Sequence, residues 1–471
     1  MDYEQKVHSF VLSHRAEMIR NLKELVRIPS YRKEAAENAP FGEDCAKALS
    51  FCEKLFSENG FSAAIDHEGG YLLAEYGDGE KSIGLFSHSD VVAPGENWQY
   101  GCPFEPVEKD GFLIGRGVWD DKSAVVASLF AMKAIKELQL PVKSKILSFV
   151  GSGEEIGMDD LGAFLEKHPR PDFSLVPDSG FPVYRGDKGR VLLRVTSRTK
   201  CKDILDFSGG QSVNIILGNA AVKLNNAGHT FDFLLENTPE NIEIQTENDA
   251  LILSATGISK HASMPEGSLN AGYVLAKFLS QCPVLCDNDR KIMQTLSQWL
   301  NDPYGAALGI ENTDPDFGKL TCANGKIRLT DGKIECTFDI RHGTSTDEST
   351  ICTNAGNVFG ACGFDFEVCS SFQPFAYPED DPFVRAVLQT YRDFTGKTEA
   401  VSRLSGGATY AYKLKKALEI GPIIWKKPPF PVLPGHGDVH QPDEMISLDG
   451  FAEAVELIIL MLLRCDEVLN A

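Results

Sequence analysis

Histidine and carboxylate side chains stand just beyond short apolar runs in the first part of the chain. His88 follows the run Ser82–Ser87, Asp178 follows the run Phe173–Pro177, and a third run, Lys145–Val150, precedes a pair of adjacent glutamates. Imidazole and carboxylate groups bind divalent metals and also serve as general bases. These positions therefore predict metal or acid–base chemistry where the runs end.

Two pairs of adjacent acidic residues lie next to these runs. Asp120 and Asp121 come just before a helical pattern, and Glu154 and Glu155 follow the third run. Adjacent residues of an extended chain point in opposite directions, so one glutamate could bind a metal while the other faces a substrate as a base. The alternative interpretations are structural, because aspartate is a common helix N-cap and a glutamate pair is also common in a solvated loop.

Two histidines stand close to further acidic residues. His88 and Asp90 are two residues apart, so in extended backbone they face the same side, and a carboxylate beside a histidine is typical of a metal ligand and the partner that orients it. His440 lies in a loop rich in Pro and Gly before the last helical pattern. Neither feature is specific alone, since a triplet of this kind is common without any metal.

Together these segments supply two histidines and three carboxylates, with two further carboxylates to spare. A pair of divalent metal ions in a hydrolase needs such a set. Imidazole and oxygen ligands suit zinc, and they also accept manganese or cobalt. The candidate ligands are His88, Asp178 and His440, with one member of the pair Asp120 and Asp121 and one of the pair Glu154 and Glu155.

The elements that position these residues follow an α/β order. The three apolar runs read as strands, and Asp121–Leu138 has the apolar spacing of a helix. Strands that alternate with a helix in this way predict a largely parallel sheet, in which ligands sit beyond the carboxyl ends of the strands. The candidate residues fall at those ends.

The pattern changes after about residue 187. Short runs rich in Thr, Val and Ile predict an α+β region with the strands Val191–Thr196 and Asp249–Ala255, the helix Leu269–Cys282, and a hairpin of Ile327–Leu329 and Lys333–Ile340. From about residue 385 helical patterns return, at Phe383–Tyr391, Ala408–Lys416 and Asp449–Leu463. We therefore expect a discontinuous α/β domain, 1–187 with 385–471, interrupted by an α+β domain, 188–384.

The first of these domains carries a family resemblance. The segment that begins His88-Ser-Asp-Val-Val-Ala-Pro-Gly and continues through Gly115-Arg-Gly to Asp120-Asp-Lys resembles the dizinc aminoacylase/carboxypeptidase metallopeptidase family. Within that family the chain is most similar to dipeptidase V and Xaa-His (carnosinase-like) dipeptidases. The resemblance covers nearly the whole length and implies a zinc-exopeptidase-like domain with a mixed, largely parallel sheet, plus an inserted α+β lid.

The resemblance also implies a role for each candidate. Asp120 would bridge two metal ions, and its peptide bond to Asp121 would be cis. His88 and Asp178 would complete one metal site, and Glu155 and His440 the other. Asp90 would orient His88. Glu154 would act as the general base, taking a proton from a metal-bridging water and giving it to the leaving amine.

The inserted domain and one later loop would complete the site by the same resemblance. His261 would stabilise the oxyanion, Asn214 would contact substrate, Arg341 would hold the substrate carboxylate, and Gly407 would line the site in the loop Ser405–Tyr410. Taken from the residues alone, each has a simpler interpretation: a surface histidine at a turn for His261, a surface ion pair for Arg341, and a plain glycine turn for Gly407.

Three positions depart from the family pattern. Ser123 stands where Gly usually follows Asp-Asp-Lys, Asp443 replaces Asn, and His436 lies four residues before His440. His436 leaves two candidates for the second metal site. We prefer His440 because the residues after it, Gln-Pro-Asp-Glu, follow the family motif more closely.

Composition limits the partners. The 471 residues carry a net charge of −21, which disfavours nucleic acid and anionic lipid as partners. The 12 cysteines are scattered without a CxxC pair, as expected of free thiols in the cytoplasm. We find no apolar stretch long enough to span a membrane, and the N-terminal segment reads as an amphipathic helix rather than a secretory signal.

The sequence therefore predicts a cytoplasmic, two-metal hydrolase that cleaves dipeptides, including Xaa-His or β-Ala dipeptides as candidates. A lid of this size could supply all catalytic parts in one chain, so we expect a monomer. The alternatives are an N-acyl amino acid deacylase or a carboxypeptidase of the same family, and a catalytically silent binding protein.

Overall fold

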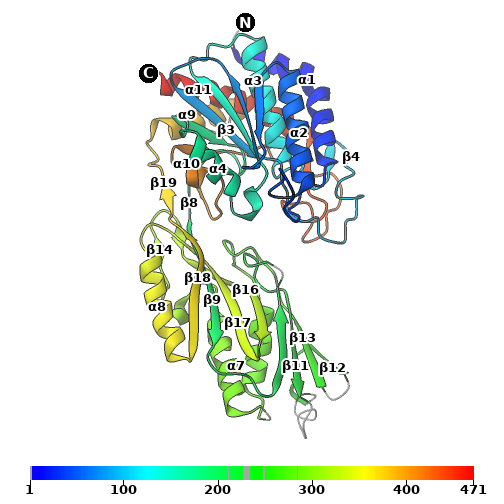
Figure 1. Cartoon of the computed structure of the whole chain (residues 1–471), viewed down its shortest axis with the longest axis vertical. Coiled ribbons are helices and arrows are strands. Elements are labelled where there is room, and N and C mark those ends of the chain that lie inside the picture. The colour runs from blue at the N-terminus through cyan, green and yellow to red at the C-terminus, as the bar shows by residue number, and fades with distance from the viewer. Residues whose placement is uncertain (1–2, 211, 226–233, 235, 248–249, 284) are drawn as a thin grey trace. The chain divides into compact units, whose positions relative to one another are not determined.

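The computed structural model describes residues 3–210, 212–225, 234, 236–247, 250–283 and 285–471. By its internal contacts the chain divides into two compact units (Figure 1): unit 1 comprises Met1–Gly186 and Ala376–Ala471, and unit 2 comprises Asp187–Phe375. Residues 376–384, which the sequence pattern placed in the lid, lie in unit 1.

A mixed sheet forms the centre of unit 1. Its strand order is β1-β2-β6-β3-β7-β21-β8-β19, with β20 paired to β8. β6, β3, β7 and β21 run parallel, whereas β1 and β2 join antiparallel on one side and β8 on the other. The strands are β1 (Ser62–Asp66), β2 (Tyr71–Tyr76), β3 (Ser82–His88), β6 (Lys145–Gly151), β7 (Phe173–Val176), β8 (Tyr184–Asp187), β19 (Phe375–Ala376), β20 (Arg403–Ser405) and β21 (Ala417–Glu419).

Alternate residues of a strand face opposite sides of the sheet, so each face has its own buried contacts. Ile146 and Val150 of β6 join the main core, whereas Phe149, between them, stacks on Phe86 and Tyr71 in an aromatic cluster. The helices of unit 1 are α1 (Tyr3–Val26), α2 (Glu43–Glu58), α3 (Lys122–Glu137), α4 (Asp159–Lys167), α9 (Pro382–Thr395), α10 (Ala411–Leu414) and α11 (Leu448–Leu469), with the 3-10 turn η1 (Glu154–Ile156).

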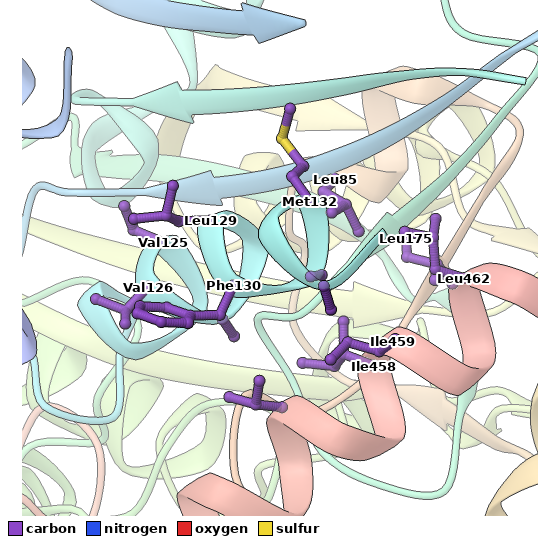
Figure 2. Close-up of a cluster of buried hydrophobic side chains, with 14 of the residues drawn as sticks. Leu85, Val125, Val126, Leu129, Phe130, Met132, Leu175, Ile458, Ile459 and Leu462 are labelled. Atoms are coloured by element: carbon purple, nitrogen blue, oxygen red, sulfur yellow. The ribbon is translucent and has the colours of Figure 1, made fainter. Parts of the chain in front are cut away.

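The core of unit 1 is built mainly on α3 and α11. Figure 2 shows Phe130 and Met132 of α3 and Ile459 of α11 among the buried side chains, near Leu85 of β3 and Leu175 of β7. Almost every residue of α3 is buried, which matches its apolar sequence. Burial on all sides fixes the helix start, and with it the acidic pair before it.

The predicted elements of unit 1 match the structure with one exception. The three apolar runs are β3, β6 and β7. The helix predicted over Ala408–Lys416 is wrong in extent, since only Ala411–Leu414 is helical. Lys415 has φ 68°, in the left-handed region, so the helix ends there, and the chain continues into β21, parallel to β7.

A small three-stranded sheet lies beside the main sheet in unit 1. Its order is β22-β5-β4, with β22 (Met445–Ser447), β5 (Phe112–Ile114) and β4 (Val107–Lys109) all antiparallel. Phe112, Ile114 and Met445 form its buried core. The sheet thus joins the segment before α3 to the segment before α11.

Unit 2 contains an antiparallel sheet of order β12-β13-β11-β10-β16-β17-β9-β18. β9 alternates buried and more exposed residues, as expected for a strand with one face on a core. The strands are β9 (Gly189–Ser197), β10 (Ile204–Gly209), β11 (Asn219–Asn225), β12 (Ile242–Glu247), β13 (Ala250–Thr256), β16 (Thr321–Thr330), β17 (Lys333–His342) and β18 (Phe364–Phe372). The α+β pattern expected for this region is confirmed.

Helices cover the buried face of this sheet. Asn270 caps the first of them through its side chain, which accepts a hydrogen bond from the Tyr273 amide. The predicted hairpin is formed by β16 and β17, and its turn residues Asp331 and Gly332 both have positive φ. The remaining elements are α6 (Ala271–Ser280), α7 (Asp287–Trp299), η2 (Ala306–Leu308), β14 (Thr313–Asp314), β15 (Gly318–Lys319) and α8 (Glu348–Ala361).

A buried aspartate in unit 2 gives a stability prediction. The Asp314 carboxylate accepts hydrogen bonds from the amides of Asp316, Phe317 and Ser345 and from two hydroxyls, and these bonds outweigh burial and lower its pKa strongly. We expect Asp314→Ala to lower the free energy of unfolding by about 2 kcal/mol, since three backbone amides, of which that of Phe317 is buried, lose their acceptor. Because the folded pKa is depressed, the contribution is present above about pH 4 and is lost as pH falls further. Denaturant unfolding at pH 7 and pH 3 checks both points: the difference from the wild type should shrink at pH 3.

No helix in the described part of the chain combines the length and apolar character that crossing a bilayer requires.

Candidate metal centre

The candidate side chains of unit 1 meet at the carboxyl ends of its parallel strands. His88 is the last residue of β3, Glu154 and Glu155 begin the turn after β6, and Asp178 follows β7. Asp120 lies in the turn between β5 and α3, and His440 precedes β22. The parallel order of β6, β3 and β7 explains why residues distant in sequence arrive together.

The first cluster consists of His88, Glu154 and Asp178. One ligand atom from each lies within 4.8 Å of the others. The imidazole of His88 is fully buried, and its Nε2 lies 3.6 Å from Asp178 Oδ2. These three residues could hold one metal ion.

The second cluster consists of Asp120, Glu155 and His440, again with ligand atoms within 4.8 Å of one another. His440 Nε2 lies 3.0 Å from Asp120 Oδ2 and 3.1 Å from Glu155 Oε1. The His440 side chain is 39% exposed, so this cluster is the more open of the two.

Asp120 connects the two clusters. Its Oδ1 lies 3.1 Å from His88 Nε2, while its Oδ2 faces His440. His88 Nε2, Asp120 Oδ1 and Glu155 Oε1 are buried and make no well-oriented hydrogen bond within the described chain. Buried polar atoms are seldom left without a partner, so their convergence fits a pair of cations that share the Asp120 carboxylate.

Asp90 contacts both His88 and the turn that carries Glu154 and Glu155. Its Oδ1 lies 3.4 Å from His88 Nδ1, and its carboxylate accepts hydrogen bonds from the amides of Glu154 and Glu155 at 3.3 and 3.2 Å. His88 Nδ1 also lies 3.0 Å from the Asp90 carbonyl oxygen. Asp90 therefore fixes the ring of His88 and the glutamate turn together, which fits the orienting role expected for it.

The electrostatics of the site show an excess of negative charge. Burial and the Asp178 charge raise the pKa of Glu154 well above its ordinary value, and burial with the Asp120 charge raises the pKa of Asp178 to about 7. The Glu155 carboxylate raises the pKa of His440 to about 12. Carboxylates that resist ionisation beside an imidazole that holds its proton make a site that bound cations would stabilise.

Asp121 does not act as the helix cap that was considered from the sequence. It stands at the N-cap position of α3, but its side chain makes no capping bond there. Its Oδ2 instead accepts a hydrogen bond from the amide of His88 at 3.2 Å, and its peptide bond to Asp120 is cis, as the resemblance implied. Asp121 therefore holds the end of β3 while Asp120 faces the clusters.

Two further buried carboxylates, to which the sequence analysis gave no role, hold the loops that carry the candidates. Glu444 accepts hydrogen bonds from the amides of Gly117, Trp119 and Asp120 and forms a buried ion pair with Arg116 at 2.5 Å. Asp160 accepts hydrogen bonds from the amides at the start of the glutamate turn and from the Tyr410 hydroxyl. Glu444 was visible in the motif after His440, but its partners are more than 300 residues away.

Gly407 lies in the loop between β20 and α10. Its amide donates to Ser405 Oγ at 3.0 Å. The same loop is tied to the residue after Asp178, because the buried Glu419 carboxylate accepts hydrogen bonds from Thr409 and from Ser179. The loop is thus connected, through Ser179, to the segment that carries Asp178.

The structure separates the two histidines of the last loop. His440 faces Asp120 and Glu155, as described above. His436 Nδ1 lies 2.6 Å from the buried carboxylate of Asp443 and is absent from both clusters. His440 is therefore the histidine that can complete the second cluster.

Three of the predicted substrate residues belong to unit 2. His261 Nδ1 accepts a hydrogen bond from the Ser263 amide, so a neutral His261 carries its proton on Nε2. The Asn214 carbonyl oxygen accepts a hydrogen bond from the Ala262 amide at 2.8 Å, which brings the two segments side by side. Arg341 is nearly buried and forms a two-pronged ion pair with Asp339.

A third group of candidate metal ligands, in unit 2, has a structural explanation. Asp203, Cys286 and Asp289 lie close enough to hold a metal ion. However, the Asp289 carboxylate already accepts hydrogen bonds from the amides of Lys202, Asp203 and Ile204. We assign this group to the packing of α7 against the start of β10.

Comparison with known proteins decides the family. The family model described as Peptidase family M20/M25/M40 matches residues 84–464, a span that includes every candidate ligand. The chain belongs to this peptidase family. The resemblance seen in the sequence is thereby confirmed, and with it the assignment to the metallopeptidases.

Relatives of this M20/M25/M40 chain span nearly its whole length. A Bacillus subtilis (strain 168) protein named "Putative dipeptidase YtjP" is 27% identical over 463 residues, which cover 95% of this chain and 96% of that one. The crystal structure of human carnosine dipeptidase 1 matches with a TM-score of 0.61 at 16% identity, over 99% of both chains. The dipeptidase Dug1p from Saccharomyces cerevisiae matches with a TM-score of 0.59 at 13% identity, again over 99% of both. The predicted fold class is therefore confirmed.

Proposed function

We propose that this chain is a two-metal dipeptidase that hydrolyses the peptide bond of dipeptides. The observation that carries the proposal is the arrangement of Asp120, whose two carboxylate oxygens face two histidines from separate clusters. The names of the relatives supply the substrate class, since the B. subtilis relative and both structural neighbours are designated dipeptidases.

Five residues would hold the metal ions. His88 and Asp178 would bind one ion, Glu155 and His440 the other, and Asp120 both. Glu154 also lies in the first cluster. We nevertheless assign it the role of base, because the next residue in the chain, Glu155, would bind the ion of the second cluster. When bound, the divalent ions would lower the pKa of the attacking water and polarise the scissile carbonyl.

The protein's own residues would move the proton. Glu154 accepts a proton from the attacking water and donates it to the leaving amine as the peptide bond breaks. Its raised pKa suits a group that must hold a proton between taking it from the water and returning it to the amine. The Asp90 carboxylate accepts a hydrogen bond from the Glu154 amide and so keeps Glu154 in place. It also orients His88 through its contact with Nδ1 of the imidazole.

The residues of unit 2 would bind the substrate. His261 would donate from Nε2 to the oxyanion, a role that its tautomer supports. Arg341 would hold the substrate carboxylate, with Asp339 fixing its guanidinium. Asn214 and, from unit 1, Gly407 would contact the rest of the substrate. Zinc is the metal we favour for an imidazole and carboxylate set, with manganese or cobalt as alternatives.

We further propose that the enzyme is a cytoplasmic monomer. The cytoplasmic location is supported by the cysteines, all 12 of which lie in the described chain as free thiols. The monomeric state is supported by the presence of all the proposed residues in one chain. A mass from light scattering that corresponds to an obligate dimer would contradict the latter.

A substrate panel combined with metal analysis tests the function. Purified protein is assayed on dipeptides, tripeptides and N-acetyl amino acids, and its metal content is measured in parallel. We expect two divalent ions per chain and the highest kcat/KM on dipeptides. Turnover of N-acetyl amino acids alone would indicate the deacylase, turnover of longer peptides the carboxypeptidase, and no turnover with metal bound the silent binding protein.

A further inference from the structure

The segment His436–Glu444, called here the strap, carries His440 and is attached to unit 1 at its C-terminal end. The Glu444 carboxylate holds the turn that bears Asp120, as described above. The neighbouring Asp443 accepts hydrogen bonds at Oδ1 from the amides of Gln99 and Tyr100, at 2.9 and 3.0 Å. The strap is therefore fixed at its C-terminal end, and the candidate ligand lies several residues before that end.

The second attachment is the contact between His436 and Asp443. The Nδ1 of His436 lies 2.6 Å from Asp443 Oδ2, and the Asp443 side chain is fully buried while that of His436 is 11% exposed. Within the closed strap, the Gly437 amide donates to the Pro442 carbonyl oxygen at 2.9 Å. The contact thus closes the strap on itself around His440. His436 and Asp443 both depart from the family pattern, and their side chains contact each other.

His440 needs such a support. Its φ is 64°, a left-handed conformation that a residue with a Cβ adopts at some cost. Its side chain is partly exposed, so packing alone does not fix it. Its ring must nevertheless stay within about 3 Å of two carboxylates on other segments.

We propose that His436 and Asp443 are positioning residues, which hold His440 against Asp120 and Glu155 and so set the affinity of the second cluster for its divalent ion. This inference rests on the proposed function of the same site. It assigns His436 no contact with metal or substrate. Groups that orient a metal ligand typically contribute a factor of about 10 to 100 in metal affinity.

Zinc titration of the metal-free protein tests the inference. Zn²⁺ is titrated in competition with a chromogenic chelator against the wild type, His436→Ala, His436→Gln and His440→Ala. We expect two tight equivalents in the wild type, and a second equivalent weakened about 10- to 100-fold in His436→Ala with the first unchanged. His440→Ala should weaken the same equivalent, and His436→Gln, which keeps an N–H donor, should lie closer to the wild type.

Controls separate a local effect from a loss of structure. His67→Ala removes an exposed histidine elsewhere in unit 1 and should bind zinc as the wild type does. If His436→Ala does not fold, as judged by circular dichroism, His436→Phe retains the side-chain volume without the hydrogen bond and takes its place. Wild-type binding of both equivalents by the tested variant, or equal weakening of both, would overturn the inference. A wild type that fails to bind two ions would instead contradict the proposed metal centre.

Discussion

Replacing Glu154 by glutamine is expected to lower kcat by about three orders of magnitude while leaving the metal content unchanged. General acid–base catalysis by a positioned side chain contributes roughly 10²- to 10⁴-fold. Glutamine keeps the size of the side chain but can neither accept nor return a proton. Because the variant should still bind substrate, KM should change little. Steady-state kinetics on the preferred dipeptide, with metal analysis of the same sample, measure both effects.

The pH dependence sharpens this prediction. Burial and the Asp178 charge raise the pKa of Glu154 above its ordinary 4.5, so the carboxylate is protonated over a wider range of acidic pH. Activity of the wild type should fall as the pH decreases and Glu154 becomes protonated, and the residual activity of Glu154→Gln should lack that limb. Glu166→Gln, on an exposed position of α4, is the matched control and should behave as the wild type. A near-normal rate in Glu154→Gln would contradict the proposed role.

Replacing Asp120 by asparagine is the second change with a large expected effect. Asp120 faces both clusters, so loss of its charge should weaken binding of both metal ions, whereas Glu155→Gln should weaken only one. A neutral amide is a poorer ligand for a divalent cation and also leaves His88 and His440 without their shared carboxylate. We expect kcat/KM to fall by at least about 10³-fold, as for loss of a metal-assisted mechanism. Metal analysis after dialysis should find less than one ion per chain.

A control keeps the second prediction specific. Asp110→Asn makes the same chemical change at an exposed turn with positive φ, which asparagine tolerates, and should retain two ions and full activity. Restoration of Asp120→Asn activity by excess zinc or manganese would show that affinity is the main loss. Two tightly bound ions in Asp120→Asn would contradict the bridging position.

The candidate residues lie at or just after recognisable strands, so many of them could be predicted from the sequence. His88 ends a strand of plainly apolar composition, and Glu154, Glu155 and Asp178 come shortly after two others. Parallel strands bring their carboxyl ends to one edge. The order of strands and helices likewise indicated the α/β class and the change to an antiparallel region. Periodicity reports these features because each depends on neighbours a few residues away.

The hydrogen bonds that hold the site are not local, and only the tertiary structure decided them. Sequence offered Asp121 as a helix cap, but the fold places the His88 amide within its reach instead. It left His436 and His440 as rivals, whereas the strap turns one toward Asp443 and the other toward Asp120. Glu444 finds its partners in the turn before α3, hundreds of residues earlier.

The sequence by itself determined the strands and the types of residue that could bind metal, because these follow from composition and spacing, and its motifs resembled the family that the comparison confirmed. The tertiary structure decided which carboxylates face a cluster and which accept backbone amides behind it. The physical reason is that an isolated aspartate or glutamate is compatible with either role. Only the donors that the fold brings within about 3 Å distinguish a ligand such as Asp120 from a support such as Glu444.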